Sequence, residues 1–158
     1  MFERQAVRAV IMRGSEILLL YTRRYDDFSF PGGGLAPGED PVKGLRRELL
    51  EETGAANVSM ERYIGHVDEH RPPLKGGYDV LFMRSHFYLC SVTGELGAAA
   101  PEAYEVANGM VPRWIDIEAA LGHNRRVLDT RPPSMGLSIE RETWMLTYVS
   151  GQMSAPVR

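Results

Sequence analysis

Three glutamates that lie close together form the pattern in this 158-residue chain most able to do chemistry. Glu48, Glu51 and Glu52 stand three and four residues apart, so a helix would place their carboxylates on one face. Like charges at this spacing destabilise a helix by about 0.2–0.5 kcal/mol per pair. Arg47 lies four residues before Glu51 and can offset only part of that repulsion. A cluster that opposes its own helix indicates a compensating cation, and oxygen ligands favour Mg²⁺ or Mn²⁺.

A solvated acidic helix face is the alternative interpretation, and it is the commoner fate of a Glu-rich helix. The preceding segment favours the metal site instead. Phe30 and Pro31 lead into a predicted turn of three consecutive glycines, Gly32, Gly33 and Gly34. Backbone without Cβ atoms can approach a ligand or a metal closely and offer its carbonyls or amides.

Local signals predict where the helix that carries the glutamates begins and ends. Asp40 is a good N-cap, and Pro41 falls at the first helical position, where its missing N–H costs nothing. Gly54 falls where a left-handed C-terminal cap is needed. The apolar stripe that would face the core has the three- and four-residue spacing of a helix and consists of Val42, Leu45 and Leu49.

Residues 33–55 resemble the signature of the Nudix hydrolases, in its generic, MutT-like form. Gly33, Glu39 and the run Arg47-Glu48-Leu49-x-Glu51-Glu52-x-Gly54-Ala55 fill every constrained position of that signature. Nine constrained positions would match by chance with a probability below about 10⁻⁸ per start site. The resemblance implies a single domain over residues 1–158, with an α/β fold: a Nudix-like α/β/α sandwich around a mixed central β-sheet.

The resemblance also implies an activity, the hydrolysis of a pyrophosphate bond in a nucleoside diphosphate joined to another group. The implied metal ligands are Glu48, Glu51, Glu52 and the carbonyl of Gly32, with Mg²⁺ or Mn²⁺ as cofactor. Glu48 is also the candidate general base. Arg47 completes the catalytic set by orienting the glutamates through ion pairs. Glu39 would brace the loop against the helix, and Gly33 and Gly54 would be structural.

A further metal ligand is expected from a later loop, where Glu102 and Glu105 are the candidates. Glu105 comes nine residues before Trp114, a spacing that resembles one Nudix subgroup, whereas a solvated loop glutamate is the alternative. The residues expected to contact substrate are Arg23, Arg24, Gly33, Gly34 and Glu69. For the two arginines, a charged turn in solvent is the alternative.

A histidine-rich segment, residues 66–70, looks like a zinc-binding set because it contains His66, Asp68, Glu69 and His70. Alternation along a strand would place residues 66, 68 and 70 on one face and Glu69 on the other. We therefore expect no zinc site within this segment.

Composition excludes several other classes of protein. A hydrophobic fraction of 44% and a charged fraction of 25% are those of a globular domain, and a net charge of −3 gives no attraction to nucleic acid or anionic membrane. The single cysteine, Cys90, excludes an internal disulfide framework. No segment has the pattern of a signal peptide or the length of a membrane span. We expect a cytoplasmic protein that binds a small nucleotide, and the family allows a homodimer.

The remaining elements follow from periodicity and turn residues. Strands are predicted over residues 6–12, 16–21, 28–30, 59–67, 80–90 and 113–117. Helices are predicted from Ile117 to Leu121, capped by Asp116, and after Ser138. Residues 71–79 and 98–103 are predicted loops, and residues 122–136 receive no assignment.

The substrate and even the retention of catalysis stay open. Oxidised nucleoside triphosphates, dinucleoside polyphosphates, ADP-ribose, nucleotide sugars and capped or triphosphorylated RNA share the bond that the signature defines. Small nucleoside di- and triphosphate derivatives are preferred because the chain lacks the positive charge that binds a long RNA. A Nudix-derived binding or regulatory module without catalysis is the alternative, although such modules usually lose signature residues.

Overall fold

The computed structural model describes residues 2–71, 81–100 and 102–154. Contacts divide the chain into two compact units. The first unit contains residues 1–11 and 31–100, and the second contains residues 12–30 and 101–158. The expectation of a single domain over residues 1–158 stays a prediction.

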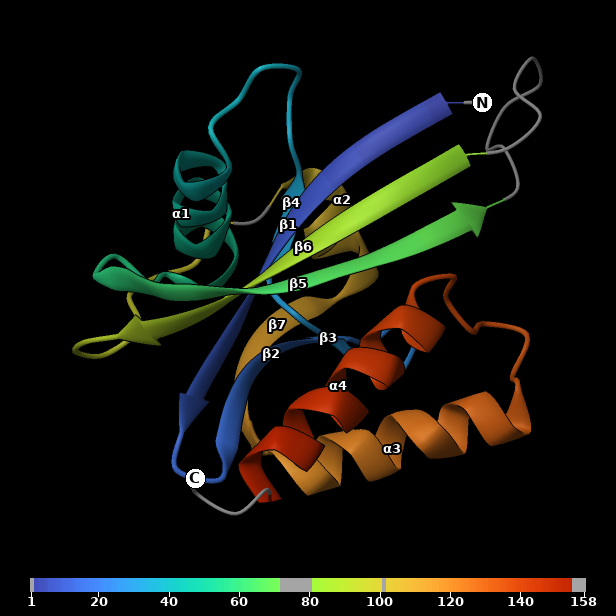
Figure 1. Cartoon of the computed structure of the whole chain (residues 1–158). Helices are drawn as coiled ribbons and strands as arrows, with labels where there is room; N and C mark the ends of the chain where they lie inside the picture. The colour runs from blue at the N-terminus through green and yellow to red at the C-terminus, as the bar shows by residue number, and fades with distance from the viewer. Residues whose placement is uncertain (1, 72–80, 101, 155–158) are drawn as a thin grey trace. The chain divides into compact units, whose positions relative to one another are not determined.

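The first unit is a mixed β-sheet with one helix. β1 (Phe2–Arg13) pairs antiparallel with β4 (Gly32–Gly34) and parallel with β6 (Leu81–Val92), and β6 pairs antiparallel with β5 (Val58–Arg71). Figure 1 shows α1 (Pro41–Thr53), in teal, lying beside these strands. The combination of parallel and antiparallel pairs with a packed helix confirms the predicted α/β fold with a mixed sheet.

The three consecutive glycines form strand β4, so the prediction of a turn at this position was wrong. Their backbone pairs in register with Ala6, Val7 and Arg8 of β1. Gly32 has a φ of +147°, and a Cβ there would overlap the carbonyl oxygen of Val7. Only glycine allows the two strands to approach this closely at this backbone angle.

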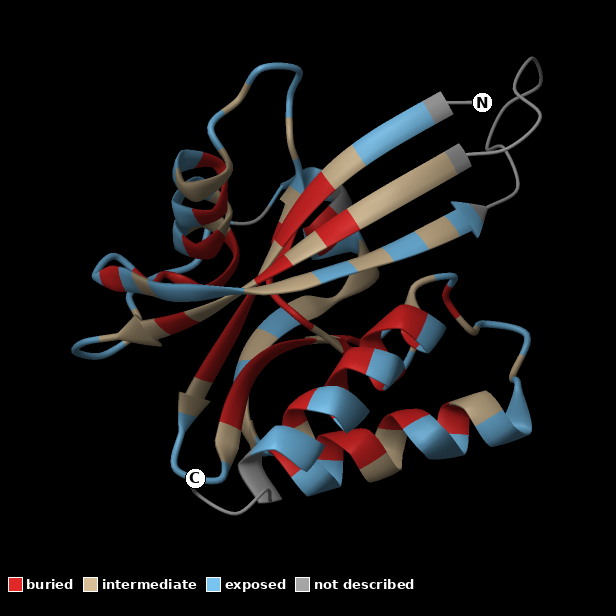
Figure 2. Ribbon diagram, in the orientation of Figure 1, coloured by how far each residue is buried: buried red, intermediate tan, exposed pale blue. Residues whose placement is uncertain are grey.

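The ends of α1 confirm the predictions made from its caps. Asp40 Oδ2 accepts a hydrogen bond from the backbone N–H of Lys43 at 2.9 Å, and Gly54 adopts the left-handed conformation with φ +75°. Leu45 and Leu49 are fully buried, and Figure 2 shows α1 with red, buried positions on one face and pale blue, exposed positions on the other. Burial contributes about 1.5–3 kcal/mol for each leucine side chain.

The second unit contains a small antiparallel sheet built around β2 (Glu16–Thr22). β2 pairs with β7 (Met110–Asp116) along its whole length and with β3 (Asp27–Ser29) at its end. The last residues of β1, Met12 and Arg13, pair with the start of β2 and form the predicted hairpin. Figure 2 shows that most of β2 is buried.

Three helices accompany this sheet: α2 (Ala103–Asn108), α3 (Ile117–Thr130) and α4 (Ile139–Ser154). α3 and α4 pack side by side, as Figure 1 shows in orange and red, and both contact β3. Asp116 caps α3 as predicted, because its Oδ2 accepts a hydrogen bond from Ala119 N at 3.1 Å. α4 begins directly after Ser138, also as predicted.

α3 extends nine residues beyond its predicted end at Leu121 and accounts for most of the unassigned segment. Within this extension Asn124 is fully buried although it interrupts the apolar pattern. Its side chain donates to Phe28 O at 2.9 Å and accepts from Phe28 N at 3.0 Å. These bonds to a distant strand satisfy the amide, and helical periodicity alone does not reveal them.

The remaining strands differ from the predictions in their lengths. β5 and β6 are longer than predicted at their ends, and β7 begins at Met110, before the predicted start at Arg113. Of the predicted loop at residues 71–79, all but the first residue lies outside the described residues. None of the helices that the structure describes combines the length and the apolar character needed to cross a bilayer.

Asp27 on β3 is a buried acid, and burying its charged carboxylate costs free energy of folding. Its side chain is 4% exposed, and its Oδ2 makes no hydrogen bond. Glu142 of α4 is fully buried, and Arg141 Nη2 binds its Oε1 at 2.7 Å. Burial, followed by the negative charges of Glu142 and Asp26, raises the pKa of Asp27 to about 6.

We predict that Asp27→Asn removes a specific part of the pH dependence of stability. The folded-state pKa of about 6 lies above the unfolded value of about 3.9, so wild type loses stability as Asp27 ionises between these two pH values. The lost free energy of unfolding should reach about 2–3 kcal/mol above pH 6. The free energy of unfolding, measured with urea at pH 4 and pH 7.5, should be higher in the variant than in wild type mainly at pH 7.5.

Asp129→Asn, on an exposed position of α3, is the matched control. It should leave the free energy of unfolding close to that of wild type at both pH 4 and pH 7.5. The account of Asp27 fails if the difference between Asp27→Asn and wild type is the same at both pH values.

Candidate functional site

Two elements of the first unit, α1 and β4, build the candidate site. The backbone N–H of Gly32 donates to Glu52 Oε1 at 2.8 Å and joins the glycine strand to the last turn of the helix. Glu52 is only 5% exposed, so this carboxylate has a fixed position between the two elements. Gly33 lies against Glu48, because a Cβ at Gly33 would come within 2.8 Å of the carboxylate carbon.

Arg47 connects the carboxylates of the site to one another. Its Nη2 lies 3.2 Å from Glu39 Oε2, and its Nη1 lies 3.1 Å from Glu48 Oε1 and 3.8 Å from Glu51 Oε2. The guanidinium is 43% exposed, so water screens these ion pairs, and they affect the geometry of the site more than its stability.

Glu39 ties this network to the loop before α1. Its Oε1 accepts a hydrogen bond from the backbone N–H of Ala36 at 3.1 Å. That hydrogen bond and, to a smaller extent, the Arg47 guanidinium lower the pKa of the Glu39 carboxyl. Glu39 therefore contacts both the loop and the helix.

Glu51 provides the observation that fits a cation. Its Oε2 is buried and makes no hydrogen bond, and its ion pair with Arg47 spans 3.8 Å. A buried carboxylate oxygen without a donor costs free energy unless a positive charge completes its surroundings. The available donors are carboxylate and carbonyl oxygens, which suit Mg²⁺ and Mn²⁺ better than softer metals.

The glutamates do not form a ready-made cage for a metal. In residues 2–71, 81–100 and 102–154, no three His, Cys, Asp or Glu side chains converge in that way. Mg²⁺ tolerates such an open arrangement because it keeps several waters and binds through one or two carboxylates together with substrate phosphates. We therefore expect metal and phosphate to bind this site together.

The first unit brings together most of the residues that the signature predicts. The group consists of Gly32, Gly33, Glu39, Arg47, Glu48, Glu51 and Glu52. Arg4 is a further candidate that the sequence patterns do not identify. A Cβ at Gly34 would lie 2.9 Å from Arg4 Nη2, so this guanidinium lies beside the glycine strand. Only the pairing of β4 with β1 brings these two residues together.

Glu105 lies on helix α2 of the second unit, so the expectation that it belongs to a loop was wrong. Its Oε1 accepts a hydrogen bond from Glu102 N at 2.9 Å, and the residue is 3% exposed. This contact closes the first turn of α2 and accounts for the burial of the carboxylate without a metal. The sequence gives little sign of this helix, because glutamate is a weak N-cap. A metal-binding role for Glu105 stays a prediction.

The remaining predicted contacts lie elsewhere in each unit. Arg23 and Arg24 of the second unit donate backbone hydrogen bonds to the carbonyls of Gly109 and Asn108, at 3.1 and 2.9 Å. The Arg24 side chain also binds Asn108 Oδ1 at 3.0 Å. Glu69 of the first unit lies on β5, paired in register with Met83. Substrate contact by these residues stays a prediction.

Comparison with known proteins gives a family and several relatives. A family model described as NUDIX domain matches residues 3–135. Diphosphoinositol polyphosphate phosphohydrolase 3-alpha from Homo sapiens is 28% identical over 147 residues, which cover 91% of this chain and 79% of that protein. RNA pyrophosphohydrolase from Bartonella bacilliformis is 26% identical over 133 residues, covering 75% of this chain and 67% of that protein.

Solved structures share the fold at lower sequence identity. The mutator MutT protein from Bacillus halodurans superposes with a TM-score of 0.62 at 18% identity, covering 92% of this chain and 81% of that chain. The E. coli ORF135 protein superposes with a TM-score of 0.60 at 20% identity, covering 99% and 96% of the two chains. These similarities confirm the α/β fold.

We predict that Gly33→Ala displaces the Glu48 carboxylate without unfolding the protein. The new Cβ would meet the end of a side chain that can move, and the backbone at Gly33 is not left-handed. Affinity for Mn²⁺ in the presence of imidodiphosphate should fall by about 10–100-fold, the effect expected when the surroundings of a metal ligand are disturbed. Electron paramagnetic resonance of free Mn²⁺ would measure the change.

Gly122→Ala on α3 is the control, since a Cβ there has only ordinary contact, at 3.6 Å, with Arg126. Both variants should keep melting temperatures close to that of wild type. Unchanged Mn²⁺ affinity in Gly33→Ala would show that the space beside Glu48 has no role in metal binding.

Proposed function

This chain belongs to the NUDIX domain family, and we propose that it is a pyrophosphohydrolase that uses Mg²⁺ or Mn²⁺ to hydrolyse small nucleoside di- or triphosphate derivatives. The names of its relatives include two phosphohydrolases that act on phosphoanhydride bonds. The observation that supports the metal requirement is the buried Oε2 atom of Glu51, which has no hydrogen-bond donor. Glu51 shares its face of α1 with two further carboxylates, those of Glu48 and Glu52. Membership of the family explains why the full set of acidic residues is present.

The residues of α1 and β4 have distinct parts in this proposal. When bound, the divalent cations neutralise charge on phosphoryl oxygens and lower the pKa of a bound water. Glu48, Glu51 and Glu52 would hold the cations, and the Gly32 carbonyl would be a further ligand. Glu52 is well suited to this because the Gly32 N–H fixes one of its oxygens at 2.8 Å.

Glu48 is the proposed general base, which accepts a proton from the attacking water. Arg47 holds its Oε1 at 3.1 Å, and the missing side chain at Gly33 leaves room for the carboxylate. Arg47 itself acts as a positioning residue, because its two nitrogens bridge Glu48 and Glu39 and so fix the helix against the loop before it. Arg4 supplies a positive charge beside Gly34 that a substrate phosphate could approach.

The relatives and the net charge of the chain bear on the substrate. One relative is named for a diphosphoinositol polyphosphate and another for RNA, so the similar proteins differ in the group that carries the phosphates. The net charge of −3 argues against a long polyanion, which leaves small nucleotides as the preferred class. A cytoplasmic location and a homodimer are parts of the same proposal that follow from the family.

A substrate panel tests the activity directly. We expect Mg²⁺-dependent phosphate or pyrophosphate release from at least one of a nucleoside triphosphate, a dinucleoside polyphosphate, ADP-ribose, a diphosphoinositol polyphosphate and a triphosphorylated RNA, with products identified by mass. Glu52→Gln should lower turnover at least about 100-fold, because a direct ligand matters more than its surroundings. Glu95→Gln changes an exposed glutamate and should leave turnover unchanged.

An absence of turnover on the whole panel, together with tight binding of one member, would favour the alternative of a binding module without catalysis. Equal turnover in Glu52→Gln and wild type would remove Glu52 from the metal site.

Glu105→Gln separates a metal ligand from a structural residue. Glutamine at this position of a helix can still close the capping contact with Glu102, so stability should be close to that of wild type. If the Glu105 carboxylate binds metal, the variant should need about tenfold or more additional Mg²⁺ for half-maximal turnover. Glu102→Gln tests the second candidate in the same assay. An unchanged Mg²⁺ requirement in Glu105→Gln would refute its role as a ligand.

A further inference from the structure

A pair of histidines on the sheet of the first unit forms a second polar cluster, separate from the glutamates. His66 of β5 and His86 of β6 lie directly opposite each other in the antiparallel register. Their ring centroids are 5.9 Å apart. Side chains at opposed positions of neighbouring strands are close enough to share a ligand.

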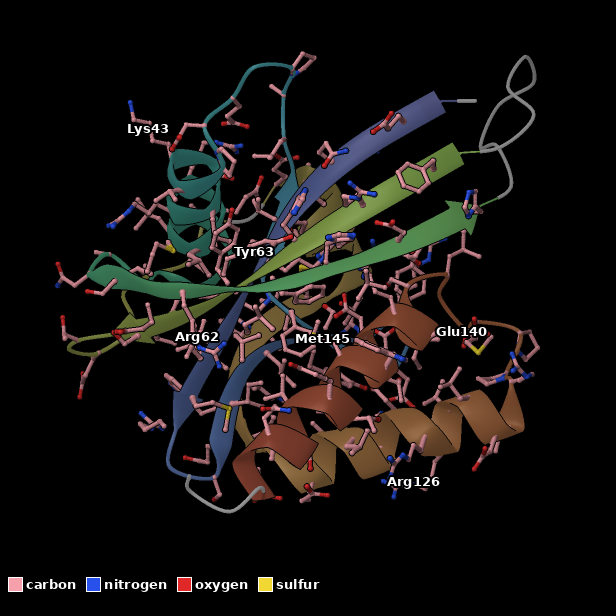
Figure 3. All side chains as sticks on the ribbon, viewed as in Figure 1. Lys43, Arg62, Tyr63, Arg126, Glu140 and Met145 are labelled. Carbon is pink, nitrogen blue, oxygen red and sulfur yellow. The ribbon has the colours of Figure 1, made fainter. Side chains whose placement is uncertain are left out.

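An irregularity in β5 brings Tyr63 to the same cluster. The pairing with β6 shifts between Tyr63 and Gly65, and Gly65 has a φ of +150°. Such a bulge re-aims the side chains around it, so Tyr63 and His66 share a face although they are three residues apart. Tyr63 Oη lies 2.8 Å from His86 Nδ1 and 3.4 Å from His66 Nδ1. Figure 3 labels Tyr63, which lies on the side of the sheet where α1 packs.

The far nitrogen of His86 has a partner that determines which nitrogen carries the proton. His86 Nε2 lies 2.7 Å from Gln5 Oε1, and the Gln5 amide nitrogen donates to Glu3 Oε1 at 3.1 Å. Because the amide of Gln5 is oriented by Glu3, its oxygen faces His86 and accepts the Nε2 proton. The lone pair of His86 is therefore on Nδ1, toward Tyr63.

The far nitrogen of His66 is backed by a carboxylate. His66 Nε2 lies 3.7 Å from Asp68 Oδ2, and Arg84 binds both oxygens of Asp68, at 2.8 and 3.0 Å. Histidines that bind metals usually donate the distant ring N–H to a carboxylate or a carbonyl oxygen, which orients the other nitrogen. His86 has such a partner in Gln5, whereas Asp68 lies near His66 without a hydrogen bond to it, and both Nδ1 atoms face the Tyr63 hydroxyl.

We propose that His66 Nδ1, His86 Nδ1 and Tyr63 Oη bind a transition-metal dication of the Zn²⁺ or Cu²⁺ class. Imidazole nitrogens favour these metals, whereas the carboxylates of α1 favour Mg²⁺ or Mn²⁺. The phenol becomes a ligand by releasing its proton to solvent as the metal binds. Tyr63 is 45% exposed, so metal can reach the site and water can complete the coordination.

This site differs from the zinc set that the sequence presents at residues 66–70. Both carboxylate oxygens of Asp68 are bound by Arg84, and the His70 ring packs on Phe82 with centroids 5.3 Å apart. The second imidazole comes from β6, twenty residues further along the chain. Periodicity within β5 therefore excludes the local set but does not reveal this one.

Titration of the full-length protein with Zn²⁺ and Cu²⁺ tests the proposal. Excess Mg²⁺ is present throughout to compete with Zn²⁺ and Cu²⁺ for the carboxylates of α1. We expect one equivalent to bind, with a visible phenolate-to-Cu²⁺ charge-transfer absorption. Tyr63→Phe should abolish this absorption, and His66→Gln and His86→Gln should each weaken binding at least about 100-fold.

Three variants are matched controls. His70→Gln and His123→Gln change histidines outside the proposed set, and Glu51→Gln changes the carboxylate site. All three should bind Zn²⁺ and Cu²⁺ as wild type does, and binding in Glu51→Gln separates this proposal from the proposed hydrolase activity. Melting temperatures without metal check that each variant is folded.

The proposal is overturned if wild type shows no saturable binding of either metal. It is also overturned if folded His66→Gln and His86→Gln bind as tightly as wild type, or if the Cu²⁺ absorption persists in Tyr63→Phe.

Discussion

The close contact between a strand of glycines and a helix of glutamates is the constraint on which the rest of the site depends. Gly32 can pair with β1 only because it has no Cβ, and in that position its N–H reaches Glu52 at 2.8 Å. Gly33 then leaves the space that the Glu48 carboxylate fills. The backbone of β4 thus fixes one carboxylate by a hydrogen bond and positions another by leaving room for it. A side chain at Gly33 would displace the Glu48 carboxylate, whereas one at Gly32 would overlap the backbone of β1.

The same face of α1 carries an electrostatic cost that the fold only partly removes. Arg47 has one guanidinium for the carboxylates of Glu39, Glu48 and Glu51, and its 3.8 Å distance to Glu51 leaves Oε2 of that residue without a donor. The core side of the helix, with Leu45 and Leu49 fully buried, provides the stability that allows this repulsion to persist. Such incomplete pairing is expected where the missing positive charge comes from a ligand instead of from the protein.

The sequence predicts the features that depend on neighbouring residues and fails where distant segments meet. The start and end of α1 follow from Asp40 and Gly54, whose capping interactions are local. By contrast, Gly32 forms a strand only because β1 is available to pair with it, and Asn124 can be buried in α3 because Phe28 satisfies its amide. Arg4 joins the site for the same reason, since its position beside Gly34 is a product of strand pairing. A pattern read along one segment contains no information about such partners.

The two metal sites argued for the first unit differ in the chemistry of their ligands, and this difference keeps them separate. Carboxylates on a helix give an open set of hard oxygens that needs substrate phosphate to complete it, which suits a cation that exchanges with each turnover. Histidines on paired strands, one of them hydrogen-bonded to Gln5, give a more rigid set of borderline ligands. Strand pairing fixes the distance between His66 and His86 before any metal binds, so little ordering is needed on binding. On these two proposals the unit would hold two kinds of cation, a hard one at the carboxylates and a borderline one at the histidines.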